Sequence, residues 1–323
     1  MTQSTNHLPA FGRLGLGTAN LGNLYRELTD DVAWQILDVA WESGIRYFDT
    51  APHYGLGLAE RRLGAFLQTK PRDDYVISTK VGRLLRPNPE GAGTLDLQNE
   101  YAVPADLKRV WDFSPDGVRR SLDESLDRLG LGSVDVLYLH DPERHDLALG
   151  MSDGIPALAR LRDEGVVRAI GVGSMVTETL LETALTGLAD VLMVAGRYTL
   201  AEQPVYPGVL EACTANGVRI VNASVFNSGL LATNDPATKA RYDYGGVPPE
   251  VLARAQSIAA IAQSFDVELP AAALQYSLRD PLVASVVTGS STPEQLRQNV
   301  ERMDAPIPEA FWQRLTDEGL IHP

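Results

Sequence analysis

The sequence has little of three features that mark particular classes of protein: cysteine, long apolar runs and basic charge. Cys213 is the only cysteine in 323 residues, which excludes an intrachain disulfide. No uninterrupted apolar run approaches the roughly 20 residues that a membrane-spanning helix needs. The formal net charge of -14 opposes binding to nucleic acid or anionic membranes, because no basic stripe is available to release counterions. The polar N-terminus lacks the charged start and apolar core of a signal peptide, so we expect a cytoplasmic protein.

Linkers are also missing from the sequence. No Ser/Gly-rich tract, charge block or low-complexity segment divides the chain, so we expect a single domain over residues 1–323. The apolar content of 44% supports a large core. A single α/β barrel commonly needs about 250 residues plus insertions, and this chain is long enough to form one.

Short apolar runs alternate with amphipathic stretches along the whole chain. The runs predict strands at residues 14–18, 45–48, 75–79, 134–139, 166–172, 191–194, 218–221 and 283–288. Strands followed by helices favour an α/β fold, a (β/α)8 TIM barrel rather than a doubly wound sheet. Helix starts are expected at Thr29, Ser114 and Thr292, which can serve as N-caps. Two long connections, at about 81–113 and 222–249, are expected to be loops, the first of them over the functional site.

Three of the predicted strands lead directly into a titratable side chain. Asp49, Lys80 and His140 stand at these strand exits, and Tyr54 follows Asp49 by five residues. The carboxyl ends of neighbouring barrel strands lie close together, so these side chains are expected to converge. A tyrosine beside an ammonium can exchange protons, because the positive charge favours the phenolate, and an imidazole can orient a substrate oxygen. The residues alone leave an alternative, in which Asp49 caps a turn and Tyr54 covers the core.

Three segments carry a resemblance to a known family. Residues 44–55 (GIRYFDTAPHYG), 78–80 (STK) and 139–140 (LH) resemble, in order and spacing, the motifs of the aldo-keto reductase superfamily. The resemblance covers essentially the whole chain and implies a nicotinamide-dependent oxidoreductase on a (β/α)8 barrel. It implies a catalytic tetrad in which Tyr54 is the general acid/base, Lys80 favours its deprotonated form, Asp49 pairs with Lys80 and His140 orients the reacting oxygen. No metal site is expected, because His53 and His140 lack further ligands at metal-binding spacing.

Four further segments are similar to one branch of this superfamily, whose members oxidise aldoses and pyridoxal. They lie at residues 22–25, 80–83, 195–200 and 226–231. This similarity implies oxidation of the hemiacetal hydroxyl of L-fucose, D-arabinose or L-galactose to a lactone, with Tyr54 as general base. Pyridoxal is the alternative substrate. Two other hypotheses stay open: an NADPH-dependent aldehyde reductase, and a cofactor-binding regulatory protein.

The segment after the last predicted strand indicates the cofactor. NADPH-using members of the superfamily hold the adenosine phosphate with a lysine and an arginine where this chain has Gly289 and Gln295, so the resemblance implies NAD over NADP. Arg297 lies about 200° round the helix from Gln295 and is not expected to substitute for that arginine. Ala195 and Ala223 stand where a glutamine and an aromatic residue usually hold the nicotinamide. The cofactor contacts implied by the resemblance are Gly17, Thr18, Ser174, Asn227, Gly229, Leu231, Gly289, Ser290, Gln295, Gln298 and Asn299.

The residues near Gln295 have an alternative role, because they can simply cap and solvate a surface helix. Substrate contacts are expected from Tyr25, His53, Trp111 and Arg197. Trp111 is the strongest candidate, since an aromatic side chain in a long loop over a barrel mouth can pack on a sugar or ring face. Ordinary surface or loop packing is the alternative for each of the four. The expected partner is a small molecule, a sugar or pyridoxal.

Overall fold

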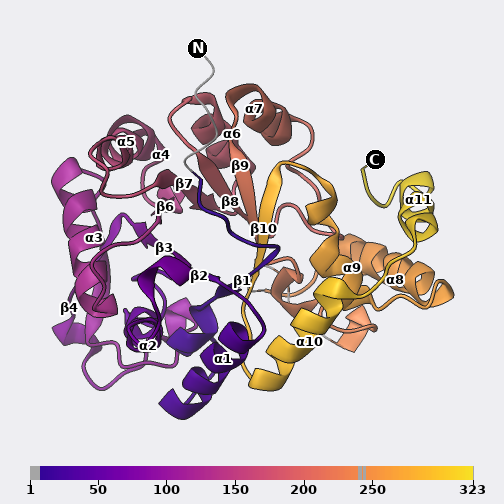
Figure 1. Cartoon of the computed structure of the whole chain (residues 1–323), viewed down its shortest axis with the longest axis horizontal. Coiled ribbons are helices and arrows are strands. Elements are labelled where there is room, and N and C mark those ends of the chain that lie inside the picture. Colours follow the sequence, from indigo (N-terminus) through magenta and orange to yellow (C-terminus); the bar gives the residue numbers. More distant parts are fainter. Residues whose placement is uncertain (1–7, 239–241, 243–244, 323) are drawn as a thin grey trace.

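The computed structural model describes residues 8–238, 242 and 245–322. Within this part of the chain, parallel strands close into a barrel in the order β1, β2, β3, β6, β7, β8, β9 and β10, and β10 pairs with β1 (Figure 1). The strands are β1 Leu14–Gly17, β2 Tyr47–Asp49, β3 Val76–Val81, β6 Val136–His140, β7 Ala169–Ser174, β8 Val191–Ala195, β9 Arg219–Ala223 and β10 Val283–Thr288. This arrangement confirms the predicted (β/α)8 TIM barrel.

Helices surround the strands (Figure 1). They are α1 Asp30–Glu42, α2 Leu58–Leu67, α3 Pro115–Leu129, α4 Leu147–Leu149, α5 Ile155–Asp163, α6 Thr177–Leu185, α7 Gly208–Asn216, α8 Pro249–Ser264, α9 Leu269–Gln275, α10 Pro293–Asp304 and α11 Glu309–Asp317. The predicted caps are confirmed, since the hydroxyls of Thr29, Ser114 and Thr292 each accept a backbone N–H three residues further on, at 3.1 to 3.3 Å. None of the helices in the described residues is both long and apolar enough to cross a membrane.

Strand β7 and helix α9 differ from the prediction, and β2 and β6 each begin two residues later than predicted, at Tyr47 and Val136. β7 begins at Ala169 and not at Val166, because Gly165 ends α5 with a φ of 75° and the N–H of Val166 bonds back to the carbonyl of Leu161 at 2.9 Å. The chain therefore reaches the sheet three residues later than its apolar run suggests. Helix α9 was not predicted, because its first six residues, LPAAAL, are all apolar and show no amphipathic periodicity.

The expected loop at 81–113 contains a two-stranded antiparallel sheet. Strand β4 (Arg83–Pro87) pairs with β5 (Leu107–Trp111), and Arg83 stands opposite Trp111 in the register. In the second expected loop, 222–249, β9 continues to Ala223 and short 3₁₀ turns follow at Asn227–Gly229 and Pro236–Thr238. Residues 239–241 and 243–244 of that loop lie outside the described residues.

The barrel interior is filled with side chains. Tyr47, Tyr138 and Met193 are among the buried residues there, and the ring of Phe11 packs edge-on against Tyr47 at a centroid distance of 4.8 Å. Filled barrels of this type place their functional groups at the carboxyl ends of the strands, where the loops are.

Candidate active site

Three neighbouring strands bring the predicted titratable groups to one edge of the barrel mouth. Asp49 ends β2, Lys80 is the next-to-last residue of β3 and His140 ends β6. Tyr54 lies between β2 and α2. The Lys80 ammonium lies 2.6 Å from Asp49 Oδ2 and donates a hydrogen bond to the Tyr54 hydroxyl oxygen at 3.1 Å. The structure thus assembles the aspartate, lysine and tyrosine into one contiguous group.

Burial and three hydrogen bonds fix the position of the Lys80 ammonium. Lys80 and Asp49 are each only 2% exposed. The carbonyl of Thr50 accepts from the ammonium at 3.0 Å, so its three N–H bonds meet three fixed oxygens. The other oxygen of Asp49 accepts the Ser78 hydroxyl at 2.7 Å. Burial raises the pKa of the Asp49 carboxyl, while the Lys80 ammonium and the Ser78 hydroxyl oppose that rise.

Two histidines face Tyr54 across the mouth. The His140 ring stands perpendicular to the Tyr54 ring at a centroid distance of 5.9 Å, and the His53 ring lies 5.6 Å from that of His140. Burial, followed by the positive charges of Arg83 and Lys80, holds the pKa of His140 well below its usual 6.5. Burial and Arg83 likewise lower the pKa of His53. Both imidazoles are therefore neutral near pH 7, and His140 can hydrogen-bond a substrate oxygen without carrying charge.

Two charged residues beside His140 were missed by the sequence prediction. Arg83, the first residue of β4, forms an ion pair with Asp141, the residue after His140. The Arg83 guanidinium lies 4.4 Å from the centroid of the Trp111 ring, and Asp141 Oδ2 lies 3.7 Å from His140 Nε2. The signals in the sequence were the place of Arg83 in the similar segment 80–83 and the position of Asp141 directly after His140.

The β4–β5 hairpin also holds His53. Arg109 on β5 makes two hydrogen bonds to the Asp96 carboxylate, at 2.6 and 3.0 Å, and donates to the His53 carbonyl at 2.9 Å. Trp111 ends β5, and its ring stacks on His145 at 5.5 Å with an interplanar angle of 3°. The hairpin thus brings two predicted substrate residues, His53 and Trp111, to the part of the mouth that holds the tetrad.

The other two predicted substrate residues lie on different loops. Tyr25, after β1, has a φ of 65° and an exposed fraction of 42%, and its N–H donates to the Glu100 carbonyl at 2.8 Å. Arg197, after β8, donates from Nε to the Met175 carbonyl at 2.8 Å. Arg197 therefore lies beside the end of β7, next to Ser174.

Two predicted cofactor residues each carry a buried polar atom that has no hydrogen-bond partner in the described part of the chain. These atoms are Asn227 Oδ1 and Ser290 Oγ, on residues that are 1% and 3% exposed. An unpaired buried polar atom costs about 1–3 kcal/mol, so both atoms fit a site for a polar ligand. They follow β9 and β10, which are paired in the sheet. Between them in sequence, Gly229 has a φ of 102°, and a Cβ on it would meet nothing within 4 Å in that part of the structure.

The β1 side of the mouth is closely packed. A Cβ on Gly17 would lie 3.1 Å from a β10 methyl group, and a Cβ on Gly289 would lie 2.3 Å from Asn20 Oδ1. The N–H and the hydroxyl of Thr18 both donate to the Asp49 carbonyl, each at 2.9 Å. A larger residue at either glycine would therefore require a neighbouring side chain, Val287 or Asn20, to move.

Several polar groups at the start of α10 are hydrogen-bonded to one another. The Gln295 side-chain carbonyl accepts the N–H of Ser291 at 2.9 Å, and Gln298 donates to the Glu294 carboxylate at 3.2 Å. Asn299 is buried, at 6% exposure. Of these three predicted cofactor residues, Gln295 and Gln298 already have protein partners.

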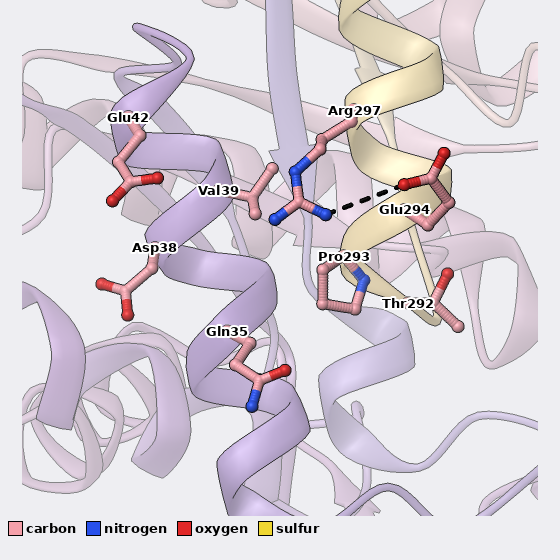
Figure 2. Close-up of a pocket in the computed structure, with 8 residues that line it drawn as sticks. All are labelled: Gln35, Asp38, Val39, Glu42, Thr292, Pro293, Glu294 and Arg297. Carbon is pink, nitrogen blue, oxygen red and sulfur yellow. Dashed lines mark ion pairs between the residues drawn. The ribbon is translucent and has the colours of Figure 1, made fainter.

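Arg297 faces a different part of the surface from Gln295. Its guanidinium lies 3.8 Å from Glu294 and points into the groove between α1 and α10 (Figure 2). This open groove on the outside of the barrel has a volume of about 450 Å³ and is lined by Gln35, Asp38, Val39, Glu42, Thr292, Pro293, Glu294 and Arg297. None of the tetrad lines it.

The remaining predicted cofactor residues have their own contacts. Ser174 ends β7, donates to Glu143 at 2.7 Å and accepts the N–H of Val176 at 2.9 Å. Leu231 is fully buried, and its N–H donates to the Phe226 carbonyl at 3.1 Å. Among the described residues no cluster of three or more His, Cys, Asp or Glu side chains could hold a metal ion.

Comparison with known proteins identifies the family. The sequence model described as "Aldo/keto reductase family" matches residues 13–318. D-threo-aldose 1-dehydrogenase from a Pseudomonas species is 56% identical over 313 residues, which cover 97% of this chain and 95% of that protein. Pyridoxal 4-dehydrogenase from Microbacterium luteolum is 39% identical, over 95% of this chain and 94% of that protein. A solved aldo-keto reductase from Bacillus halodurans, in its holo form, shares the fold with a TM-score of 0.74 at 24% identity, over 94% of this chain and 91% of that one. The chain therefore belongs to the aldo/keto reductase family of NAD(P)-dependent oxidoreductases.

Proposed function

We propose that the protein oxidises the hemiacetal hydroxyl of an aldose to a lactone with NAD, and that Tyr54 is the general base. The observation that carries the proposal is the Lys80 ammonium, which lies 3.1 Å from the Tyr54 oxygen and 2.6 Å from the Asp49 carboxylate. The 56% identity to D-threo-aldose 1-dehydrogenase supports an aldose as substrate. L-fucose, D-arabinose and L-galactose are the first candidates.

The proton step follows from these contacts. A phenol ordinarily holds its proton well above neutral pH, and the Lys80 ammonium stabilises the phenolate form of Tyr54. Asp49 keeps that ammonium in place. Tyr54 then accepts the proton of the anomeric hydroxyl. At the same time the C–H bond of the anomeric carbon breaks, and the C=O bond of the lactone forms at that carbon. A bound nicotinamide supplies the hydride acceptor.

His140 is proposed to hold the reacting oxygen. Its ring stands perpendicular to that of Tyr54, 5.9 Å away, and its pKa is held low by burial and by Arg83. A neutral imidazole can orient the oxygen by a hydrogen bond without competing for the proton that Tyr54 removes.

The residues that would hold NAD lie at the ends of β1, β9 and β10. Asn227 and Ser290 offer buried oxygens that suit a polar ligand. NADP carries an additional phosphate, which proteins commonly bind with arginine or lysine. Gly289 supplies no cation, and Arg297 pairs with Glu294 on the α1 side of α10. These features support NAD as the preferred cofactor.

Pyridoxal is the second candidate substrate, supported by the 39% identity to pyridoxal 4-dehydrogenase. Its cyclic hemiacetal would undergo the same proton step at Tyr54. The greater identity to the aldose enzyme, 56%, favours the sugar.

The test measures formation of reduced cofactor from NAD and from NADP with L-fucose, D-arabinose, L-galactose and pyridoxal. Wild type, Tyr54→Phe and Tyr75→Phe are compared; Tyr75 precedes β3 at the opposite end of the barrel and controls for loss of a phenol hydroxyl. We expect turnover of an aldose with NAD that Tyr54→Phe loses and Tyr75→Phe keeps. Turnover with NADP alone would contradict the cofactor assignment. Cofactor binding without turnover of any substrate would favour a regulatory protein.

A further inference from the structure

We propose that Arg83 is a positioning residue of this site: by pairing with Asp141, it prevents that carboxylate from drawing a proton onto His140. The significance for catalysis rests on the proposed function. The protonation state of His140 can be measured without turnover.

Asp141 lies where it can act on His140. It follows His140 directly and adopts the left-handed conformation, with φ 42° and ψ 58°, which non-glycine residues rarely occupy. Its Oδ2 lies 3.7 Å from His140 Nε2. An unpaired carboxylate at this distance would favour the imidazolium over the neutral ring.

Arg83 is held against Asp141 by the hairpin. Its side chain is 5% exposed and that of Asp141 is 15% exposed, so solvent screens the pair poorly. The guanidinium lies 4.4 Å from the centroid of Trp111, the residue opposite it in the β4–β5 register, and Trp111 in turn stacks on His145. Arg83 is thus fixed on one side by an aromatic ring and on the other by the carboxylate.

The remaining charged and titratable groups facing His140 come from three other elements. They are Lys80 from β3, Tyr54 and His53 from the connection between β2 and α2, and Arg144 from the turn after β6. Lys80 already has its own carboxylate partner, Asp49. Arg144 Nε lies 3.6 Å from Asp141 Oδ2, but its side chain is 54% exposed and its charge is screened by solvent. Arg83 is therefore the cation that neutralises Asp141, and Arg144 provides the matched control.

The test titrates His140 by NMR in protein labelled with carbon-13 and nitrogen-15 at histidine. The chain has five histidines, and the signal of His140 is assigned by its loss in His140→Gln. Wild type and Arg144→Gln are expected to keep His140 neutral between about pH 6 and pH 8. In Arg83→Gln the titration midpoint should rise into this range. In Arg83→Gln/Asp141→Asn it should fall back, because the carboxylate that favours the imidazolium is gone.

Arg83→Lys keeps the proposal testable if Arg83→Gln does not fold. Lysine retains the charge but loses the planar fork of the guanidinium, so the His140 midpoint should lie between those of wild type and Arg83→Gln. A midpoint that stays at its wild-type value in every folded Arg83 variant would overturn the proposal. An equal rise in Arg144→Gln would also do so, because it would reflect a general loss of positive charge.

Turnover provides a second readout. The kcat of Arg83→Gln should fall as the pH drops through the new His140 midpoint, in addition to the dependence on Tyr54 protonation that it shares with the wild type. Absence of aldose turnover in the wild type would contradict the proposed function and leave the NMR result standing. If the wild type turns over an aldose but the His140 midpoint is the same in the Arg83 variants as in the wild type, only the role of Arg83 is rejected.

Discussion

The Lys80→Met substitution removes the cation beside Tyr54 and keeps a side chain of similar length. At 3.1 Å, and with an effective dielectric constant of about 20, two unit charges attract by 332/(20 × 3.1), or about 5 kcal/mol. Because each 1.4 kcal/mol is a factor of ten in rate, about 10⁴-fold is the ceiling on the loss in kcat. Asp49 lies 2.6 Å from the same ammonium, and without it the buried carboxyl should take up a proton and cease to repel the phenolate, so we expect a smaller loss of about 10²- to 10³-fold.

The assay follows reduced cofactor under saturating aldose and NAD, with the affinity for NAD measured separately by fluorescence. Lys108→Met makes the same change on the exposed side of β5 and should leave kcat unchanged. Asp49→Asn/Lys80→Met removes both charges of the buried pair and should be as slow as Lys80→Met, which separates loss of the cation from an unpaired carboxylate. A Lys80→Met enzyme within about threefold of wild-type kcat would refute the role given to the ammonium.

Three further changes have defined outcomes. Tyr54→Phe should lower kcat by about 10²- to 10⁴-fold with unchanged NAD affinity in the fluorescence assay; a weaker affinity would indicate a binding role. Arg109→Ala leaves the Asp96 carboxylate buried and unpaired, so the free energy of unfolding in urea should fall by about 3–5 kcal/mol, and a loss no larger than that of Lys108→Ala would contradict this. The unfolded chain should bind protons at His53 and His140 before the folded chain does, because both folded-state pKa values lie below 6.5. Each histidine should therefore remove about 1.4 kcal/mol of stability per pH unit below pH 6.5, until the pH reaches its folded-state pKa. The stability difference between pH 7.5 and pH 5.5 should be smaller in His53→Gln/His140→Gln, and an equal difference would contradict the buried neutral state.

The barrel could be predicted because its signals are local. Alternating strands and helices appear in the order of the chain, and the caps at Thr29, Ser114 and Thr292 need only the residues next to them. The β4–β5 hairpin could not be predicted in this way. Charged residues, Lys108 and Arg109, interrupt the apolar pattern of β5, and its pairing with β4 crosses a long irregular segment.

The candidate site could also be predicted only in part. Asp49, Lys80 and His140 were visible because each stands at a strand exit, and the structure brings them together. Arg83 and Asp141 were not recognised, because their pairing depends on how the hairpin folds back over the mouth. The sequence shows which charges are present in such a segment, but long-range packing decides which of them meet.

The identity of the product tests the proposed oxidation most directly. Wild-type protein is incubated with NAD and L-fucose labelled with carbon-13 at the anomeric carbon, and the early product is observed by NMR while reduced cofactor is measured in the same sample. We predict that the anomeric signal is replaced by a lactone carbonyl signal, one lactone for each reduced NAD, and that Tyr54→Phe forms both about 10²- to 10⁴-fold more slowly. Reduced NAD without a lactone, or a lactone formed equally by Tyr54→Phe, would contradict oxidation of the hemiacetal hydroxyl with Tyr54 as the base.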